Sequence, residues 1–299
     1  TFHGGFVICF EKGWAVEKKF YDLTNDAVFK LVFGQEQNAW ILKGMLNALL
    51  ELEGRDRICE LSVLNPANDA EFVGDKVTYL DVKVKDELER RYNIEMQICV
   101  PRSWPKRALY YASKLYASQL LEGQKYWELK RTISLSILLE NLLRENERLH
   151  NVFRFRNEDD GALLHCDLID IHFLELQKFA KCEPEELETP LEKWLYILRY
   201  GQRYRDGTII MEESLLAEEG IEEAVKAMRF ANEDERSREL IEGHEKWKRL
   251  QDTLVGEARE ETKVAIAKNL LAKLSDEDIA EATGLAVEEV AKLRAETKA

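Results

Sequence analysis

The stretch YLDVKVKDELERRYNIEMQIC, from Tyr79 to Cys99, decides the fold. Apolar and polar side chains alternate over residues 82–85 and again over residues 93–98. A period of two residues is typical of half-buried strands, in which successive side chains point to opposite faces of a sheet. The stretch therefore predicts two antiparallel strands that are joined by a tight polar connection.

Two carboxylates oppose each other in this predicted hairpin. If the connection centres near Leu88, Asp81 lies opposite Glu95 and the two side chains share a face of the sheet. Opposed carboxylates repel each other, so either the register differs or a cation lies between them. The alternative is that both residues are ordinary surface acids. We favour the cation, because the two acids fall on adjacent strands with the correct parity.

The segments around the hairpin predict a mixed α/β domain. Apolar residues recur at helical or strand spacing, and glycines or prolines end most of the segments. Helices are expected at 24–34, 36–51, 106–123 and 192–200, and further strands at 58–64, 130–139, 151–157 and 162–176. The order over about the first 140 residues is α-β-β-β-α-β, which is a layered α/β arrangement.

The chain changes character after residue 212, where Glu, Ala, Leu, Lys and Arg dominate. A long solvated helix is expected at about 218–268, with breaks at Gly220, Gly243 and Gly256. Short helices at the end resemble a helix-turn-helix, in which Ser275 begins a helix and a small core forms from Ile279, Ala280, Leu285, Val290 and Leu293. Its second helix begins with acidic residues, which would repel phosphates. We therefore favour a packing or oligomerisation module over a module that recognises DNA.

Composition limits the classes of protein that remain. The chain has 299 residues, 45% of them hydrophobic, which is enough for one large or two modest domains. A net charge of −14 argues against a DNA-binding protein, yet basic and aromatic residues concentrate between Arg102 and Arg131. Five cysteines without a C-x-x-C pair predict reduced thiols in the cytoplasm. No apolar run approaches the ~18 residues that would span a membrane.

Asp81, Glu95 and Gln97 resemble the PD-(D/E)XK nuclease signature in its E-x-Q form, which implies hydrolysis of a phosphodiester. A divalent cation such as Mg²⁺ or Mn²⁺ polarises a phosphoryl oxygen and lowers the pKa of a bound water. Asp81, Glu95 and the carbonyl of Met96 can supply its oxygen ligands, and Gln97 can orient the water. Because Gln97 brings no charge, Lys83 is the candidate for the stabilising cation. Lys30 and Lys85 are the further candidates for that role.

The predicted helix after the hairpin combines cations with aromatic residues. Lys106, Arg107 and Lys114 alternate there with tyrosines, a combination that suits a DNA backbone and an unstacked base. Arg107 and Tyr111 are one turn apart and can both face the site. The alternative, tyrosines in the core and cations in a solvated rim, stays open, since Lys114 and Tyr111 cannot both be fully buried.

The chain resembles the Rpn family of recombination-promoting nucleases, also described as PD-(D/E)XK nuclease family transposases. The stretches that carry the resemblance are NDAVFKLVFG (25–34), ILKGMLNALL (41–50), LDVKVKD (80–86), YNIEMQ (92–97), KRALYYASKLYASQLLEGQKY (106–126), IHFLEL (171–176) and the tail IAEATGLAVEEV. The resemblance implies a restriction-endonuclease-like mixed sheet, flanked by helices, with a helical C-terminal extension. It also implies metal-dependent DNA cleavage by Asp81, Glu95 and Gln97, with Asp26 as an additional acid.

We therefore expect a Mg²⁺- or Mn²⁺-dependent DNA endonuclease of recombination or mobile elements. Its nuclease domain would cover 20–207, after a poorly ordered tail at 1–19. An acidic helical region would follow at 208–299, with the small module at about 257–299. We further expect a cytoplasmic protein without a membrane partner that can form a homo-oligomer through the C-terminal helices. The alternatives are an inactive DNA-binding or regulatory protein of the same fold and an assembly module.

Overall fold

The computed structural model describes residues 19–64, 82–164 and 168–298. The expected N-terminal tail up to residue 18 and the candidate metal ligand Asp81 lie outside these described residues. Contacts divide the chain into two compact units, one that ends at Arg238 and one that begins at Glu239. Each unit is described by itself below.

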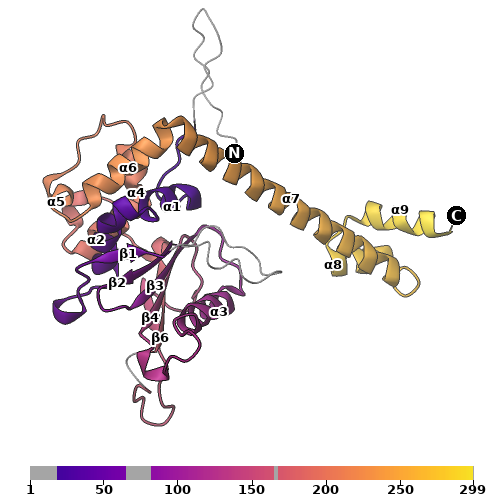
Figure 1. Ribbon diagram of the computed structural model, residues 1–299. Helices are drawn as coiled ribbons and strands as arrows, with labels where there is room; N and C mark the ends of the chain where they lie inside the picture. Colours follow the sequence, from indigo (N-terminus) through magenta and orange to yellow (C-terminus); the bar gives the residue numbers. More distant parts are fainter. Residues whose placement is uncertain (1–18, 65–81, 165–167, 299) are drawn as a thin grey trace, which may run out of the picture. The chain divides into compact units, whose positions relative to one another are not determined.

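A six-stranded mixed sheet forms the centre of the first unit (Figure 1). Its strand order is β1-β2-β3-β4-β6-β5. Strands β3, β4 and β6 run parallel to one another, whereas β1, β2 and β5 are joined to the sheet by antiparallel pairing. The strands are β1 (Leu61–Val63), β2 (Val82–Asp86), β3 (Arg91–Gln97), β4 (Thr132–Leu138), β5 (His150–Phe153) and β6 (Ile169–Glu175). The predicted mixed sheet is confirmed, with strands shorter than the alternating segments.

Helices cover both sides of this sheet. Helix α3 (Trp104–Ala117) packs against β3, β4 and β6. The other main helices of the unit gather on the side of the sheet away from α3 (Figure 1). They are α1 (Asp26–Phe33), α2 (Ala39–Leu49), α4 (Pro190–Tyr200) and α6 (Ile221–Glu233), with the short α5 (Glu213–Leu216). Helix α6 packs against α1 and α2, so the compact unit includes it.

Helix α3 ends at Ala117, well before the expected stop at Gly123. The cause is a tertiary contact of the next residues. The Gln119 side chain donates to the Lys130 carbonyl and accepts from the Lys130 N–H group, each at 2.8 Å. These two hydrogen bonds to the segment before β4 turn the chain away from the helix axis.

The β2–β3 hairpin has the register that its alternating pattern predicts. Lys83 pairs directly with Asn93, and the register centres on Leu88. The buried Asp86 carboxylate accepts hydrogen bonds from the backbone N–H groups of Leu88 and Arg90, at 3.0 and 2.9 Å. Because the turn sets the register of a hairpin, Asp86 determines which side chains of β2 and β3 share a face.

The two faces of the sheet differ in polarity. The face away from α3 is buried and mostly apolar, with Val82, Val84, Tyr92, Ile94, Met96, Ile133, Leu135, Ile137 and Leu174. Its buried polar residues have hydrogen-bond partners on the same face: Asp86 with Tyr92, Asp170 with Arg154, and His172 with His150. The α3 face is apolar only where Leu138 and Phe173 pack against Trp104 and Ala108. Towards β2 this face instead carries polar side chains that are buried or half-buried, namely Lys83, Asn93, Glu95, Ser134 and Ser136. Buried polar groups of this kind are uncommon and mark a candidate functional site.

The expected long helix is two helices that separate at a different residue. Helix α6 ends before Asp234, and α7 (Glu235–Leu270) follows it without a break at Gly243 or Gly256. The Asp234 carboxylate accepts a hydrogen bond from the Ser237 N–H group at 2.8 Å, which is the bond that an N-cap residue makes. The prediction of breaks at the two glycines was wrong, because a glycine costs a helix only about 1 kcal/mol.

The second unit ends in a small three-helix arrangement. Helices α8 (Asp276–Thr283) and α9 (Val287–Lys298) pack with the end of α7. The core consists of Ala267, Leu271, Ile279, Leu285 and Val290, with Ala280 and Leu293 partly buried against it. Ser275 caps α8 through the Asp278 N–H group, and Gly284 ends it with a φ of 71°, in the left-handed region that glycine adopts readily. These features match the predicted helix-turn-helix.

Candidate active site

Strand β3 places the side chains of Asn93 and Glu95 on the α3 face. The Glu95 residue is 5% exposed and Asn93 is 1% exposed. The Asn93 side-chain amide donates a hydrogen bond to Oε1 of Glu95 at 3.1 Å. A carboxylate is seldom buried without a partner or a cation, so Glu95 is not the ordinary surface acid of the alternative interpretation.

Lys83 lies on the same face of the sheet, because it pairs directly with Asn93 across β2 and β3. Burial lowers the pKa of its ammonium group, and the nearby charge of Lys114 lowers it further. The Glu95 carboxylate acts in the opposite direction, and Lys30 again lowers this pKa. Charged groups from α1, β2, β3 and α3 therefore meet here, and we call Lys30, Lys83, Glu95 and Lys114 the charge cluster.

The charge cluster joins three ammonium groups to a buried carboxylate. Positive potential in a partly buried site attracts the phosphates of a nucleic acid. The cluster also shows that a chain with a net charge of −14 can hold several ammonium groups close together. The net charge of the whole chain therefore does not describe the local charge around Glu95.

Helix α3 adds a second group of side chains at i, i+4 and i+7. Arg107, Tyr111 and Lys114 lie along one stripe of the helix and are all half-buried. The Arg107 guanidinium stacks on two rings, with its central carbon 5.0 Å from the centroid of Trp104 and 5.4 Å from that of Tyr111. This stacking holds the planar guanidinium in one place. Lys106, by contrast, is exposed.

Helix α1 brings Lys30 to the same region. Asp26 is the first residue of the helix, is 6% exposed, and precedes Lys30 by one turn. Gly34 caps the helix beside the start of β2, where a Cβ atom would lie 3.5 Å from Cγ2 of Val82. The end of α1 therefore lies next to the first described residue of β2.

The end of β3 contributes Met96 and Gln97. The Gln97 carbonyl accepts from the Leu139 N–H group at 3.0 Å, on the β4 side. Successive carbonyls of a strand alternate in direction, so the Met96 carbonyl points to the β2 side. The Gln97 side-chain amide donates to the Cys99 carbonyl at 2.7 Å. Its Oε1 atom is the acceptor that can serve a water molecule.

Asp81 immediately precedes β2 and lies outside the described residues. Within 19–64, 82–164 and 168–298, no group of three or more histidine, cysteine, aspartate or glutamate side chains could hold a metal ion. Of the predicted ligands, the Glu95 carboxylate and the Met96 carbonyl belong to the described residues. Both are oxygen donors, which is the donor type that Mg²⁺ and Mn²⁺ take.

Residues 23–258 match the family of PD-(D/E)XK nuclease family transposases. The chain belongs to this family. The match spans α1, β2, β3 and α3, the four elements that form the candidate site. Family membership and the mixed sheet together confirm the restriction-endonuclease-like fold class and link the chain to nucleases of mobile elements. No curated protein and no solved structure matches the chain significantly.

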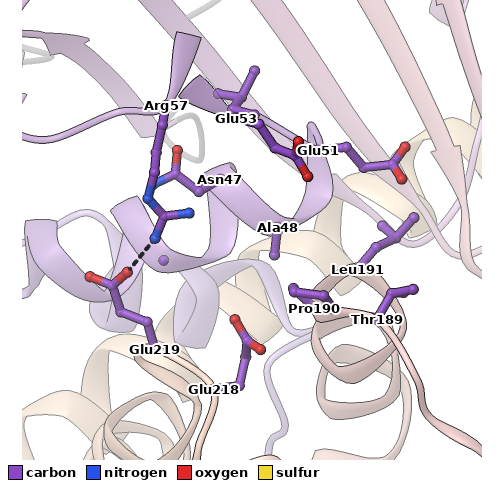
Figure 2. A pocket seen from close by; sticks show the side chains of 12 residues that line it. Asn47, Ala48, Glu51, Glu53, Arg57, Thr189, Pro190, Leu191, Glu218 and Glu219 are labelled. Atoms are coloured by element: carbon purple, nitrogen blue, oxygen red, sulfur yellow. Dashed lines mark hydrogen bonds and ion pairs between the residues drawn. The ribbon is translucent and has the colours of Figure 1, made fainter. Parts of the chain in front are cut away.

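A cavity of about 210 Å³ lies elsewhere in the first unit (Figure 2). It is lined by α2, the start of α4 and the turn before α6, and none of its lining residues comes from β2, β3 or α3. Glu51, Glu53, Glu218 and Glu219 line it, with Arg57 paired to Glu219 at 3.1 Å. An acidic lining repels phosphates, so this cavity does not suit a nucleic acid.

The sequence reading singled out neither Asn93 nor the stacking of Arg107 on Trp104. A signal existed for Asn93, because it lies two residues before Glu95 and so shares its face. His150 and His172 are hydrogen-bonded to each other at 2.9 Å. They lie on β5 and β6, away from the charge cluster. Finally, no helix in the described part of the chain has the length and apolarity to cross a membrane.

Proposed function

We propose that this chain is a metal-dependent DNA endonuclease that acts in DNA recombination or on mobile elements. The observation that carries the proposal is the buried Glu95 carboxylate on the same sheet face as Lys83. A buried acid coupled to ammonium groups, in a chain of a nuclease family, is suited to hold a cation against a phosphate.

The metal ligands in this proposal are Asp81, Glu95 and the Met96 carbonyl. Asp81 directly precedes Val82, which pairs with Ile94, the residue before Glu95. A Mg²⁺ or Mn²⁺ ion held by these oxygens would polarise the phosphoryl oxygen and acidify a water molecule. Asp26 is the additional acid in this proposal, because it lies one helical turn before Lys30 of the charge cluster.

The remaining residues have separate roles. Gln97 orients the attacking water through Oε1, because its amide group is engaged with the Cys99 carbonyl. Lys83 offsets the charge that develops on the phosphate, with Lys30 nearby in the charge cluster. The DNA backbone is held by Lys106, Arg107, Tyr111 and Lys114 of α3.

The rival proposal is an inactive protein of the same fold that binds DNA. It is favoured by Gln97, which is uncharged and engaged with a backbone carbonyl. Purified protein incubated with supercoiled plasmid in Mg²⁺, in Mn²⁺ and in EDTA separates the two. Nicked or linear product in either metal but not in EDTA supports the enzyme. DNA binding without product in any metal supports the rival.

We also propose that the chain associates with itself through α7. Leu240, Trp247, Leu250 and Leu254 are about half exposed and follow one another at spacings of seven, three and four residues, which forms one stripe. Light scattering of the full chain tests this. Leu250→Glu should lower the mass to that of a monomer, whereas Val255→Glu, away from the stripe, should not. A monomeric wild type contradicts it.

The proposed DNA substrate and the three exposed free thiols, Cys59, Cys99 and Cys182, are consistent with a cytoplasmic location. The thiols would be open to oxidation in an oxidising compartment. Fractionation of cells that express the tagged chain tests this part of the proposal. Recovery in the cytoplasmic fraction supports it, and recovery in a secreted fraction contradicts it.

A further inference from the structure

We infer that Asn93 is a positioning residue of the nuclease site, which orients Glu95 for metal binding. This inference rests on the proposed function. It concerns a residue that the charge cluster and the DNA-binding stripe do not include. Asn93 is 1% exposed and lies directly between Lys83 on β2 and Ser134 on β4.

The hydrogen bond between Asn93 and Glu95 has one chemically allowed direction. An ionised carboxylate only accepts hydrogen bonds, so the amide nitrogen of Asn93 must face Oε1 of Glu95 at 3.1 Å. This bond occupies Oε1 and restrains the rotamer of the carboxylate. The other oxygen, Oε2, would then be the one that binds the metal. Partners of this kind orient the ligands of many metal sites.

The same geometry leaves the other end of the amide without a partner. With its nitrogen on Glu95, Asn93 holds Oδ1 buried and without a hydrogen-bond partner in the described part of the chain. A buried acceptor in this state is energetically unfavourable. A donor from the site would satisfy it, and a water molecule of the metal shell is a donor that metal binding supplies. Asn93 would therefore support metal binding in two ways. Its Nδ2 donates to Glu95, and its Oδ1 would accept from a water molecule of the metal shell.

Mn²⁺ binding to the full chain, measured by calorimetry without DNA, tests this role. Asn93→Leu keeps the approximate shape of the side chain and removes both hydrogen bonds, and Asn93→Ala is the second variant if the leucine does not fit. We expect the dissociation constant for Mn²⁺ to rise about 10- to 100-fold in either variant. Asn151→Ala is the matched control and should leave the affinity for Mn²⁺ unchanged, because the buried Asn151 on β5 also donates a hydrogen bond to a buried glutamate, Glu175, at 3.3 Å.

The dependence of the cleavage rate on the Mn²⁺ concentration provides a second measurement, which a purely structural role of Asn93 would not change. Raising the Mn²⁺ concentration should restore cleavage by Asn93→Ala towards the wild-type rate, but should not restore it in Glu95→Ala. Unchanged Mn²⁺ affinity in both Asn93 variants, with binding lost in Glu95→Ala, would overturn the inference and leave the proposed function standing. A wild type that binds no Mn²⁺ would overturn both.

Discussion

Lys83 on β2 pairs directly with Asn93 on β3, so its ammonium group lies on the same face of the sheet as the Glu95 carboxylate. This relationship results from the tight turn around Leu88, whose geometry the buried Asp86 carboxylate holds. A shift of one residue in the register would move Lys83 to the opposite face. The positive charge that Gln97 lacks is therefore available from the neighbouring strand.

Replacing Lys83 with methionine should reduce cleavage more than it reduces DNA binding. Methionine keeps much of the apolar stem and removes the ammonium group, so the loss should appear in the chemical step, by about 10²- to 10³-fold. Lys85→Met is the matched control. Lys85 lies on the same strand and face, but its ammonium group forms an ion pair with Glu89 at 2.8 Å. An exposed ion pair contributes only about 0–1 kcal/mol. We therefore expect Lys85→Met to change the rate of single-turnover cleavage less than about threefold. Equal loss in both variants would contradict the role of Lys83.

Replacing Arg107 with lysine should weaken DNA binding although the charge is kept. Lysine cannot stack its head group on Trp104 and Tyr111 as the planar guanidinium does. Anisotropy of a labelled duplex in EDTA, where no cleavage is expected, measures the affinity. We expect roughly a tenfold loss, equal to about 1.4 kcal/mol. The exposed Lys106 is the comparison, and Lys106→Arg should bind as the wild type does. Wild-type affinity in Arg107→Lys would refute the stacking argument.

The pair His150 and His172 should make the fold sensitive to acid. Burial lowers the pKa of His150 to about 4, and the charges of His172 and Arg154 contribute. The unfolded chain, with a pKa of 6.5, then binds more protons than the folded chain between these values. Stability is thus complete above pH 6.5 and falls towards pH 4, by at most about 3 kcal/mol from this residue.

Urea unfolding at several pH values measures this loss. His150→Gln should flatten the pH dependence, because glutamine does not titrate. His244→Gln, in α7, is the control and should leave the dependence of the wild type unchanged. Burial also lowers the pKa of His172, so part of the dependence should remain in the His150 variant. A wild type equally stable at both ends of this range would contradict the account of the pair.

Two glycine-to-alanine changes should have opposite effects on stability. A Cβ atom at Gly44 would lie 2.4 Å from the carbonyl oxygen of Glu219, so α2 and the turn before α6 would have to move apart. We expect Gly44→Ala to lower the free energy of unfolding by about 1–3 kcal/mol. Gly243 in α7 has open space around it, and Gly243→Ala should raise the stability of that helix by about 0.5–1 kcal/mol. Thermal unfolding followed by circular dichroism compares them, and stabilisation by both would refute the packing of α2.

The hairpin could be predicted from the sequence because its signals are local. Strict alternation gives the strands and their faces, and the short polar turn gives the register on which Lys83 and Glu95 meet. The C-terminal module was also predictable, since its cap at Ser275 and its glycine at 284 lie within a few residues of the helix that they bound. Local patterns therefore identified the elements that carry the candidate site.

The features that could not be predicted depend on contacts between distant residues. The end of α3 depends on the bond between Gln119 and Lys130, which becomes visible only once β4 is placed. The approach of Lys30 and Lys114 to Lys83 requires α1 and α3 both to pack against β3. Asn93 reads as an ordinary polar strand residue, because the sequence does not show that both faces of β3 are covered.

Cleavage of supercoiled plasmid by the Glu95→Gln variant, beside the wild type, tests the central claim most directly. Glutamine keeps the size of the side chain and can still accept a bond from Asn93, but it removes the charge that would hold the metal. With folding verified by circular dichroism, we expect wild-type protein to nick or linearise the plasmid in Mg²⁺ or Mn²⁺ and the variant to leave it supercoiled. Equal cleavage by the two proteins, or wild-type cleavage that persists in EDTA, would contradict the assignment of Glu95 as a metal ligand.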